Sequence, residues 1–434
     1  MVLSRFLLYL RSPALGEVDT METQTLYQLD LDMFLSAGAG VVALLLGIFL
    51  TGKLKFLSRL CIPTPVTGGI LLSLLTLGLY AIAKVEVSFD PTLKDLCMMI
   101  FFTSVGYQSN LREVKRGGKP LAVLVLLVSV LIVMQNLLST GISASMGLGP
   151  LTGMAMGSIP MCGGHGTAGG FSSLLESMGV ESAASLSMAA ATFGLVAGSL
   201  LGGPLAERLI RTRGLAQENP SPADIASSMD STEASPHARE KMESSEQKEF
   251  RRLSAAIFQL LLAMAAGSLL SKALALTGVT FPTYFGSLIA AAIIRNICEG
   301  VPGAPSPDMD KITLVGNVCL SLFLGMAMSS LKLWELAALA LPLTVILLSQ
   351  VVLIALFGYF VAFPLLGKDY DAALLVSGLA GFGLGATPNA MANMSAVCNK
   401  YRYAVKPFII VPLVGAMFVD IINTTVITIF LNIL

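Results

Sequence analysis

Residues 147–175 read GLGPLTGMAMGSIPMCGGHGTAGGFSSLL. They end an uncharged run, 120–175, that is too long for one membrane helix of about 20 apolar residues. Residues 121–145 make one full helix of that kind. Beyond it, two prolines and a cluster of glycines break helical structure. The pattern therefore predicts a re-entrant hairpin over 147–175, with two short apolar arms around a broken tip.

A second stretch has the same form. Residues 372–399 read AALLVSGLAGFGLGATPNAMANMSAVCN, with a tip from Gly381 to Pro388. The other uncharged runs fit one membrane helix each. Together they predict ten full spans and two hairpins. The spans are expected at 33–52, 60–83, 96–111, 121–145, 182–206, 253–271, 273–294, 312–331, 336–367 and 407–434.

The composition excludes most classes of protein. Of the 434 residues, 55% are hydrophobic and 12% are charged, about half the charged share of a soluble domain. A soluble enzyme, a nucleic-acid-binding protein or a disordered scaffold could not be built this way. The net charge is zero, and the six cysteines form no CxxC pair. We therefore expect an all-α integral membrane protein without a disulfide framework, a transition-metal site or a nucleic-acid partner.

Two halves of similar design follow from these spans. Residues 214–250 are rich in Ser, Glu and Pro and predict a disordered linker. The linker separates residues 33–213 from residues 251–434, and each half holds five spans with a hairpin between the fourth and the fifth. Because five is odd, the second half must run through the bilayer in the opposite direction. Such inverted repeats with broken segments are the signature of a secondary transporter.

The distribution of basic residues predicts the orientation. Most of the 27 Lys and Arg residues fall on the side that holds the central linker. Under the positive-inside rule this side is cytoplasmic and both termini lie outside. The apolar stretch within residues 1–32 is too short to cross the membrane, and it lacks a convincing signal-peptide cleavage site. We therefore interpret residues 1–32 as an N-terminal extension.

The two tips carry the candidate functional residues. Consecutive glycines let a ligand approach the backbone, exposed N–H groups at half-helix starts favour an anion, and unwound carbonyls can hold Na⁺. The substrate-binding candidates are Ser158, Gly163, Gly164, His165, Gly166, Thr167, Gly383, Gly385, Ala386, Thr387 and Asn389. The candidates for a sodium ion are Cys162, Gly381, Asn393, Asp420 and Asn423.

Asp420 and His165 are the titratable candidates. A carboxylate deep in the last span is costly and marks a functional site. It could support a Na⁺ site or pair with a substrate ammonium, or simply form an interhelical hydrogen bond. His165 could orient a carboxylate or bond within its tip. Gln135 and Asn136 in the fourth span are read as contacts between helices. No span carries a central arginine, so a co-bound cation would have to offset the charge of an anionic substrate.

The tips also resemble those of a known family, the bacterial sodium/glutamate symporters (the ESS family). The resemblance runs from about Leu29 to the end of the chain. It implies two inverted five-span halves with a pore-loop hairpin in each, and Na⁺-coupled uptake of L-glutamate across the inner membrane. It also implies a homodimer with an elevator-like moving domain. The matching stretches are Ile159 to Gly170, Ala190 to Pro204, Gly316 to Pro342, Gly381 to Met394 and Val411 to Asn423.

Other functions remain to be weighed. The same architecture could carry another carboxylate or amino acid, or use H⁺ instead of Na⁺. A passive channel would lack saturable, Na⁺-dependent uptake. An intramembrane hydrolase using Ser158 and His165 is disfavoured, because there is no GxSxG motif and no supporting acid nearby. No ATP-binding loop of the GxxxxGK[ST] type occurs. We therefore expect a transporter rather than an enzyme, with Na⁺ as coupling ion and no cofactor.

Overall fold

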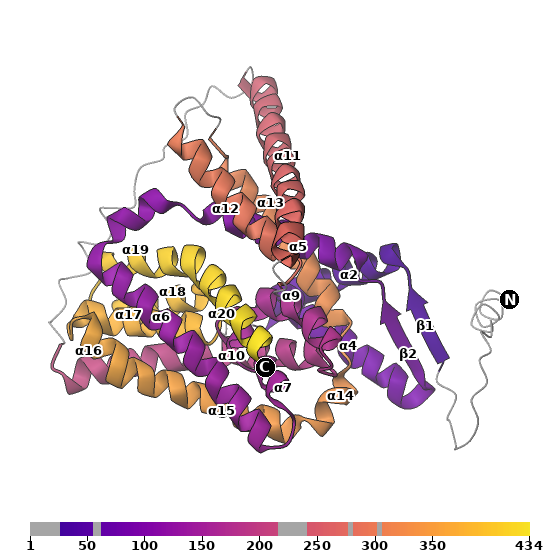
Figure 1. Ribbon diagram of the computed structural model, residues 1–434, viewed down its shortest axis with the longest axis horizontal. Coiled ribbons are helices and arrows are strands. Elements are labelled where there is room, and N and C mark those ends of the chain that lie inside the picture. Colours follow the sequence, from indigo (N-terminus) through magenta and orange to yellow (C-terminus); the bar gives the residue numbers. More distant parts are fainter. Residues whose placement is uncertain (1–26, 55–61, 216–240, 277–280, 302–305) are drawn as a thin grey trace.

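The computed structural model describes residues 27–54, 62–215, 241–276, 281–301 and 306–434. Almost all of these residues are helical (Figure 1). Eight helical segments are long and apolar enough to cross a membrane, as expected for a multi-pass membrane protein. They are Met33–Lys53 (α2), Thr64–Ala83 (α4, Thr64–Gly78, and η1, Leu79–Ala83), Gly118–Ser145 (in α6, Leu111–Ser145), Ala183–Thr212 (α10), Gln247–Ala275 (in α11), Met309–Ser329 (α13), Ala340–Leu366 (α15, Ala340–Leu356, η4, Phe357–Ala362, and α16, Phe363–Leu366) and Val405–Ile433 (α19, η5 and α20).

The other two expected spans correspond to shorter helices. Helix α5, Thr92–Gln108, has 17 residues, and helix α12, Phe285–Gly300, has 16. At 1.5 Å per residue each is about 25 Å long, somewhat less than a bilayer core of about 30 Å. The count of ten spans therefore stays a prediction. Helix α12 also begins later than the expected 273–294, since α11 runs on to Ala275. It ends later because Arg295 and Glu299 pair with each other inside the helix.

The structure also contains a small sheet and an early helix start that the sequence did not predict. Strands Tyr27–Leu31 (β1) and Val85–Phe89 (β2) form a parallel two-stranded sheet that the sequence did not predict. The rest of the N-terminal extension lies outside the described residues. Helix α11, Lys241–Ala275, begins inside the segment expected to be the linker. The helix projects from the body of the molecule (Figure 1), and the disordered linker over 214–250 stays a prediction. Residues 216–240 are not described.

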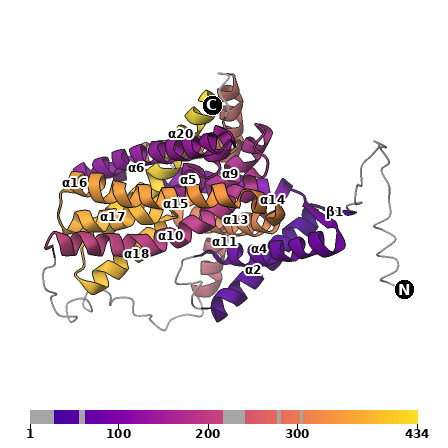
Figure 2. The ribbon, with the colours of Figure 1, turned by 90° about the horizontal axis from the view of Figure 1, so that it is seen from below.

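The helices group into two bundles (Figure 2). The first bundle consists of α2, α4, α5, α11, α12 and α13, which pack mainly on one another. The second consists of α6, of Pro150–Met154 (α7), Ser158–Met161 (α8) and Gly164–Ser177 (α9), of α10, α15 and α16, of Tyr370–Gly383 (α17) and Thr387–Lys400 (α18), and of Val405–Val414 (α19) and Asp420–Ile433 (α20). Leu333–Ala338 (α14) links the two, with contacts to α4, α10 and α15. Each bundle takes helices from both halves of the chain.

Contacts in the first bundle repeat between the halves. Helix α2 packs on α4 in the first half, and α11 packs on α12 in the second. Glycines allow close approach at both places. A Cβ on Gly47 of α2 would collide with the carbonyl of Thr64, and a Cβ on Gly286 of α12 with the carbonyl of Gly267. Across the halves, α4 packs on α13 and α12 packs on α5. Small residues at helix contacts are usual in membranes. The internal repeat stays a prediction.

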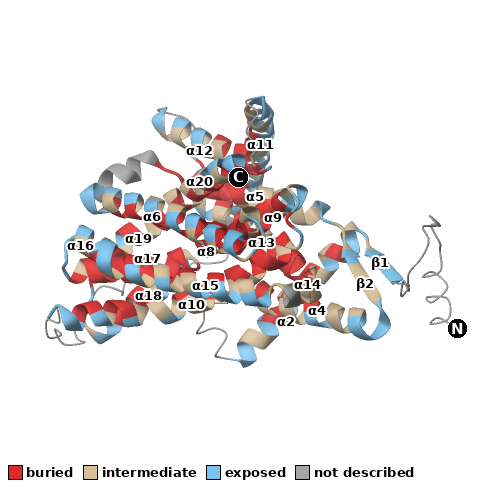
Figure 3. Cartoon of the chain, turned by 60° about the horizontal axis from the view of Figure 1, so that its bottom comes forward, coloured by how far each residue is buried: buried red, intermediate tan, exposed pale blue. Residues whose placement is uncertain are grey.

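Helix α17 forms the centre of the second bundle. Every residue of α17 except Asp371 is buried (Figure 3). The helix is apolar on all sides, and a helix of that kind belongs in the interior of a protein. It contacts α10, α18 and α19. Its last residue is Gly383, so this buried helix carries the second tip to a fixed place.

Candidate functional site

The first hairpin consists of three short helices. Helix α7 ends at Met154, α8 covers Ser158–Met161, and α9 starts at Gly164. The helix cannot run on through the break because Gly164 has a φ of +60°, a conformation that glycine adopts without the cost that a Cβ would add. The first turn of α9, with its backbone N–H groups, therefore faces the tip.

The second hairpin has a single break. Helix α17 ends at Gly383, and α18 begins at Thr387 after an extended residue, Ala386. Pro388 lies in the first turn of α18, where its missing N–H costs no helical hydrogen bond. Both hairpins therefore have the predicted helix–break–helix form. That they re-enter the membrane stays a prediction.

The two tips meet. A Cβ on Gly164 would lie 3.1 Å from the carbonyl oxygen of Gly385. A cavity of about 230 Å³ opens beside this contact. Ten of the predicted residues line it: Cys162, Gly163, Gly164, His165, Gly166, Thr167, Gly385, Ala386, Thr387 and Asp420. Among the described lining residues Asp420 is the only acid, and none is Lys or Arg.

The remaining predicted residues lie behind the tips. Asn389 and Asn393 of α18 donate their side-chain amides to the carbonyls of Leu195 and Gly198 on α10, at 2.9 and 2.8 Å. Gly381 accepts a hydrogen bond from the N–H of Ala386 at 3.3 Å. The two asparagine contacts hold the second tip against α10, and the third closes the tip on itself. The residues that do not line the cavity in the described part of the chain are Ser158, Gly381, Gly383, Asn389, Asn393 and Asn423.

Helix α6 fixes the backbone of both tips through neighbouring residues. Gln135 donates its amide to the carbonyl oxygen of Gly383 at 2.8 Å. Asn136 accepts a hydrogen bond from the N–H of Ser158 at 2.9 Å. The expected role of Gln135 and Asn136 as contacts between helices thus takes a specific form, because their partners are tip residues.

His165 bonds to a neighbouring helix. Its Nε2 lies 3.0 Å from the hydroxyl oxygen of Thr192 on α10. That hydroxyl donates its one hydrogen to the carbonyl of Met188 at 2.9 Å, so Nε2 of His165 must be the donor in the other contact. This hydrogen bond runs to α10 rather than within the tip, and the contact of His165 with a substrate carboxylate stays a prediction. Ser158 lies outside the cavity that His165 lines, which gives a hydrolytic pair no shared space.

Three buried oxygens belong to residues behind the first tip, one of which, Thr167, lines the same cavity as Asp420. A Cβ on Gly163 would touch both the Thr167 side chain and the Asn423 amide, and that amide donates to the carbonyl of Ser158 at 3.1 Å. Within the described residues, the hydroxyls of Ser158 and Thr167 and the Oδ1 of Asn423 have no hydrogen-bond partner. Buried polar groups without a partner are uncommon. Oxygens are the ligands that hard cations prefer.

Sequence reasoning did not identify the opposite wall of the cavity. Pro63, Phe101, Phe102, Leu320 and Leu324 line it from the first bundle. Apolar residues inside apolar spans carry no distinguishing signal. No group of three or more His, Cys, Asp or Glu side chains suited to a metal ion occurs in the described chain.

Comparison with known proteins identifies the family. Residues 29–403 match the family model described as sodium/glutamate symporter. The sodium/glutamate symporter of Escherichia coli (strain K12) is 38% identical over 402 residues, or 92% of this chain and 98% of the relative. That of Haemophilus influenzae is 36% identical over 383 residues, or 88% of this chain and 93% of the relative. These proteins are transporters, not enzymes, as expected for this chain. The chain belongs to the sodium/glutamate symporter family.

Proposed function

We propose that the protein is a secondary active transporter that carries L-glutamate into the cell together with Na⁺. The observation that carries this proposal is the cavity where the starts of α9 and α18 face each other beside Asp420. Relatives named sodium/glutamate symporters align over most of the chain. On this proposal the protein lies in the bacterial inner membrane, with both termini outside and the central linker in the cytoplasm.

The substrate carboxylates are proposed to bind at the two half-helix starts. A helix N-terminus offers unpaired N–H groups and a positive dipole end, so it favours an anion. Gly163 to Thr167 supply one such end, and Gly385 to Thr387 supply the other. The volume of about 230 Å³ is below the range of roughly 300–1,000 Å³ for drug-sized ligands. It suits a small amino acid.

The coupling ion is proposed to bind between the first tip and the last helix. Ser158, Thr167 and Asn423 offer the unpartnered oxygens described above, and Asp420 adds a carboxylate within the same region. A bound cation would offset the charge of the substrate, which the cavity lining does not do by itself. This arrangement gives a physical reason why ion and substrate would bind together.

Alternating access is proposed to come from movement of the second bundle against the first. Both tips belong to the second bundle, whereas the apolar wall formed by Phe101, Phe102 and Leu324 belongs to the first. An apolar wall makes few directional contacts, so a loaded tip can slide along it. We propose an elevator-type movement of this kind, in a homodimer surrounded by lipid.

The test is uptake of labelled L-glutamate into proteoliposomes. We expect accumulation with an inward Na⁺ gradient and none when K⁺ replaces Na⁺. A proton gradient without Na⁺ should give no accumulation, and accumulation under that condition would favour the H⁺-coupled alternative. Competition by unlabelled amino acids and dicarboxylates separates glutamate from other cargo. If folded protein accumulates no glutamate under either gradient, the cargo assignment is wrong.

A further inference from the structure

A second cavity of about 300 Å³ lies beside the first. The helical turn Gly415–Val419 separates the two cavities. Tyr107, Gln108 and Asn110 at the end of α5, and Arg295 on α12, line it. The opposite wall consists of Pro412, Leu413, Ala416 and Met417. Like the first cavity, it lies between the two bundles, because α5 and α12 belong to one bundle and α19 and η5 to the other.

The two cavities share their walls. Gly415–Val419 (η5) is a π-helical turn that leads into Asp420. Gly415 and Val419 line the first cavity, and Ala416 and Met417 line the second. On α5, Phe101 and Phe102 line the first cavity and Tyr107 lines the second, about 8–9 Å further along the helix. Wide π-turns recur at functional sites.

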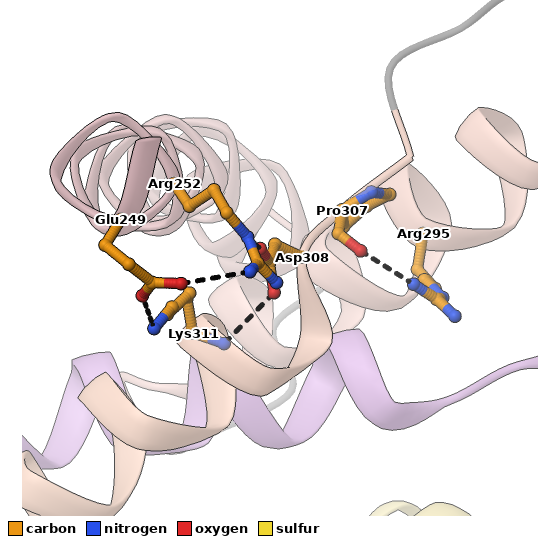
Figure 4. Close-up of polar contacts among 6 residues, drawn as sticks. All are labelled: Glu249, Arg252, Arg295, Pro307, Asp308 and Lys311. Carbon is orange, nitrogen blue, oxygen red and sulfur yellow. Dashed lines mark hydrogen bonds and ion pairs between the residues drawn. The ribbon is translucent and has the colours of Figure 1, made fainter. Parts of the chain in front are cut away.

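Arg295 is the only cation that lines either cavity in the described chain. Its side chain is 11% exposed, and it pairs with Glu299, whose side chain is 15% exposed. One guanidinium N–H faces the carbonyl oxygen of Pro307 at 3.5 Å. Figure 4 shows that Arg295 stands apart from the ion pairs of Glu249, Arg252, Asp308 and Lys311. Its Nε is buried and has no hydrogen-bond partner within the described residues.

We propose that this second cavity is a release site on the cytoplasmic side, where Arg295 receives a carboxylate of the substrate as it leaves the first cavity. A guanidinium binds a carboxylate through two parallel N–H···O bonds. Within the described residues the Nε–H of Arg295 has no acceptor, so it is available for one of them. Glu299 competes for the same guanidinium, so the substrate is held only briefly. The inference rests on the proposed function and on the predicted orientation of the chain.

The position of the cavity favours a substrate over a structural anion. A largely buried arginine that lines a cavity needs a paired partner or a ligand for its charge. Here the partner is already present in Glu299, yet one buried donor remains unpaired. The cavity is also separated from the first by a single helical turn. A group that passes this turn would meet Arg295 next.

The experiment compares substrate loading from the two faces of the membrane. Labelled L-glutamate uptake is measured in right-side-out and in inside-out vesicles, each with an inward Na⁺ gradient. For Arg295→Gln we expect at least a fivefold rise in KM from the cytoplasmic face and an unchanged KM from the outer face. For Glu299→Gln we expect the opposite sign, a lower cytoplasmic KM, because the competing carboxylate is gone.

Arg252→Gln is the matched control. It removes a cation with an ion-pair partner on the same predicted side, but Arg252 does not line the cavity, so both KM values should stay as in the wild type. If Arg295→Gln does not fold, Ala416→Phe tests the site instead, since it fills the cavity without changing charge and should slow loading from the cytoplasmic face.

The outcomes separate this inference from the proposed function. A wild-type protein that does not transport glutamate overturns the proposed function. A wild type that does, with Arg295→Gln unchanged on both faces or changed equally on both, overturns the release site alone. Vesicles of purely zwitterionic lipid form a further arm. If the effect of Arg295→Gln requires anionic lipid, Arg295 binds a headgroup and the release site is overturned as well.

Discussion

Gln135 donates a hydrogen bond from its side-chain amide to the carbonyl oxygen of Gly383, 2.8 Å away and 248 residues later in the chain. The next residue, Asn136, accepts from the N–H of Ser158. Gln350 in turn donates to the carbonyl of Gln135 at 2.9 Å. One helix of the first half therefore holds the backbone of both tips, and a helix of the second half supports it. The tips are positioned relative to each other by α6.

Gln135→Leu tests this support. The change keeps the side chain at a similar size but makes it apolar, so it leaves the buried carbonyl of Gly383 without its donor. Such a loss costs about 1–3 kcal/mol, so we expect a lower melting temperature and weaker Na⁺-dependent uptake. Ser129→Ala is the control, because the Ser129 hydroxyl on the same helix bonds only to its own helix, at the carbonyl of Val125. Equal behaviour of the two variants would contradict the role given to Gln135.

Gly164→Ala tests the contact between the tips. At a φ of +60° a Cβ costs about 1–2 kcal/mol, and it would also press on the carbonyl of Gly385. We expect uptake to fall severalfold while the protein still purifies as a folded species. Gly141→Ala on α6 is the matched control, since a Cβ there meets nothing within 4 Å. Wild-type uptake by Gly164→Ala would show that the tips need not touch as they do here.

Asp420→Asn tests the coupling ion. The change keeps the shape of the side chain and removes the only acidic charge among the described residues that line the cavity. Interactions of a charged group are worth about 1.5–3 kcal/mol, so the Na⁺ concentration for half-maximal uptake should rise at least about tenfold. Thr425→Ala on the same helix should leave it unchanged, because the Thr425 hydroxyl is exposed and bonds to Ile421. An unchanged Na⁺ dependence in Asp420→Asn would remove Asp420 from the ion site.

The sequence predicted the positions of the breaks well. Pro388 and the glycines from Gly163 to Gly166 fall where the structure interrupts its helices. Backbone restrictions act locally, so a local pattern reveals them. Asp420, which its depth in an apolar run singled out, lines the cavity, and its role there stays a prediction. The end of α12 was harder to predict because Arg295 and Glu299 cancel each other, and only the structure shows the pair.

The sequence could not assign partners. Asn389 and Asn393 were predicted as ligands in a tip, and the structure adds that their amides donate to carbonyls of α10. Gln135 looked like a general contact between helices, and it bonds to Gly383. These choices depend on which helices become neighbours, over separations of about two hundred residues. The apolar wall that includes Phe101 and Leu324 also depends on which helices become neighbours, because it faces the tips only when the two bundles meet.

The contact between Arg252 and Asp308 predicts how stability depends on pH. Asp308 precedes α13, accepts from the N–H of Lys311 at 3.3 Å, and accepts from the Nε of Arg252 on α11 at 2.6 Å. The hydrogen bond from Arg252 holds the pKa of Asp308 below its ordinary value of 3.8. A carboxyl whose pKa is lowered by folding adds stability above its unfolded pKa, and that stability is lost as the pH falls through the folded value.

We therefore expect the melting temperature in detergent to fall as the pH is lowered below about 4, the unfolded pKa of an aspartate. Asp308→Asn should lower the melting temperature at neutral pH and flatten this acid limb. The effect should be modest, because a partly exposed ion pair contributes up to about 1 kcal/mol. Asp310→Asn makes the same change of charge two residues further on and should keep the acid limb. Asp308→Asn could keep the wild-type fall of the melting temperature at low pH while Asp310→Asn removes it. In that case the contact between α11 and α13 does not cause this fall.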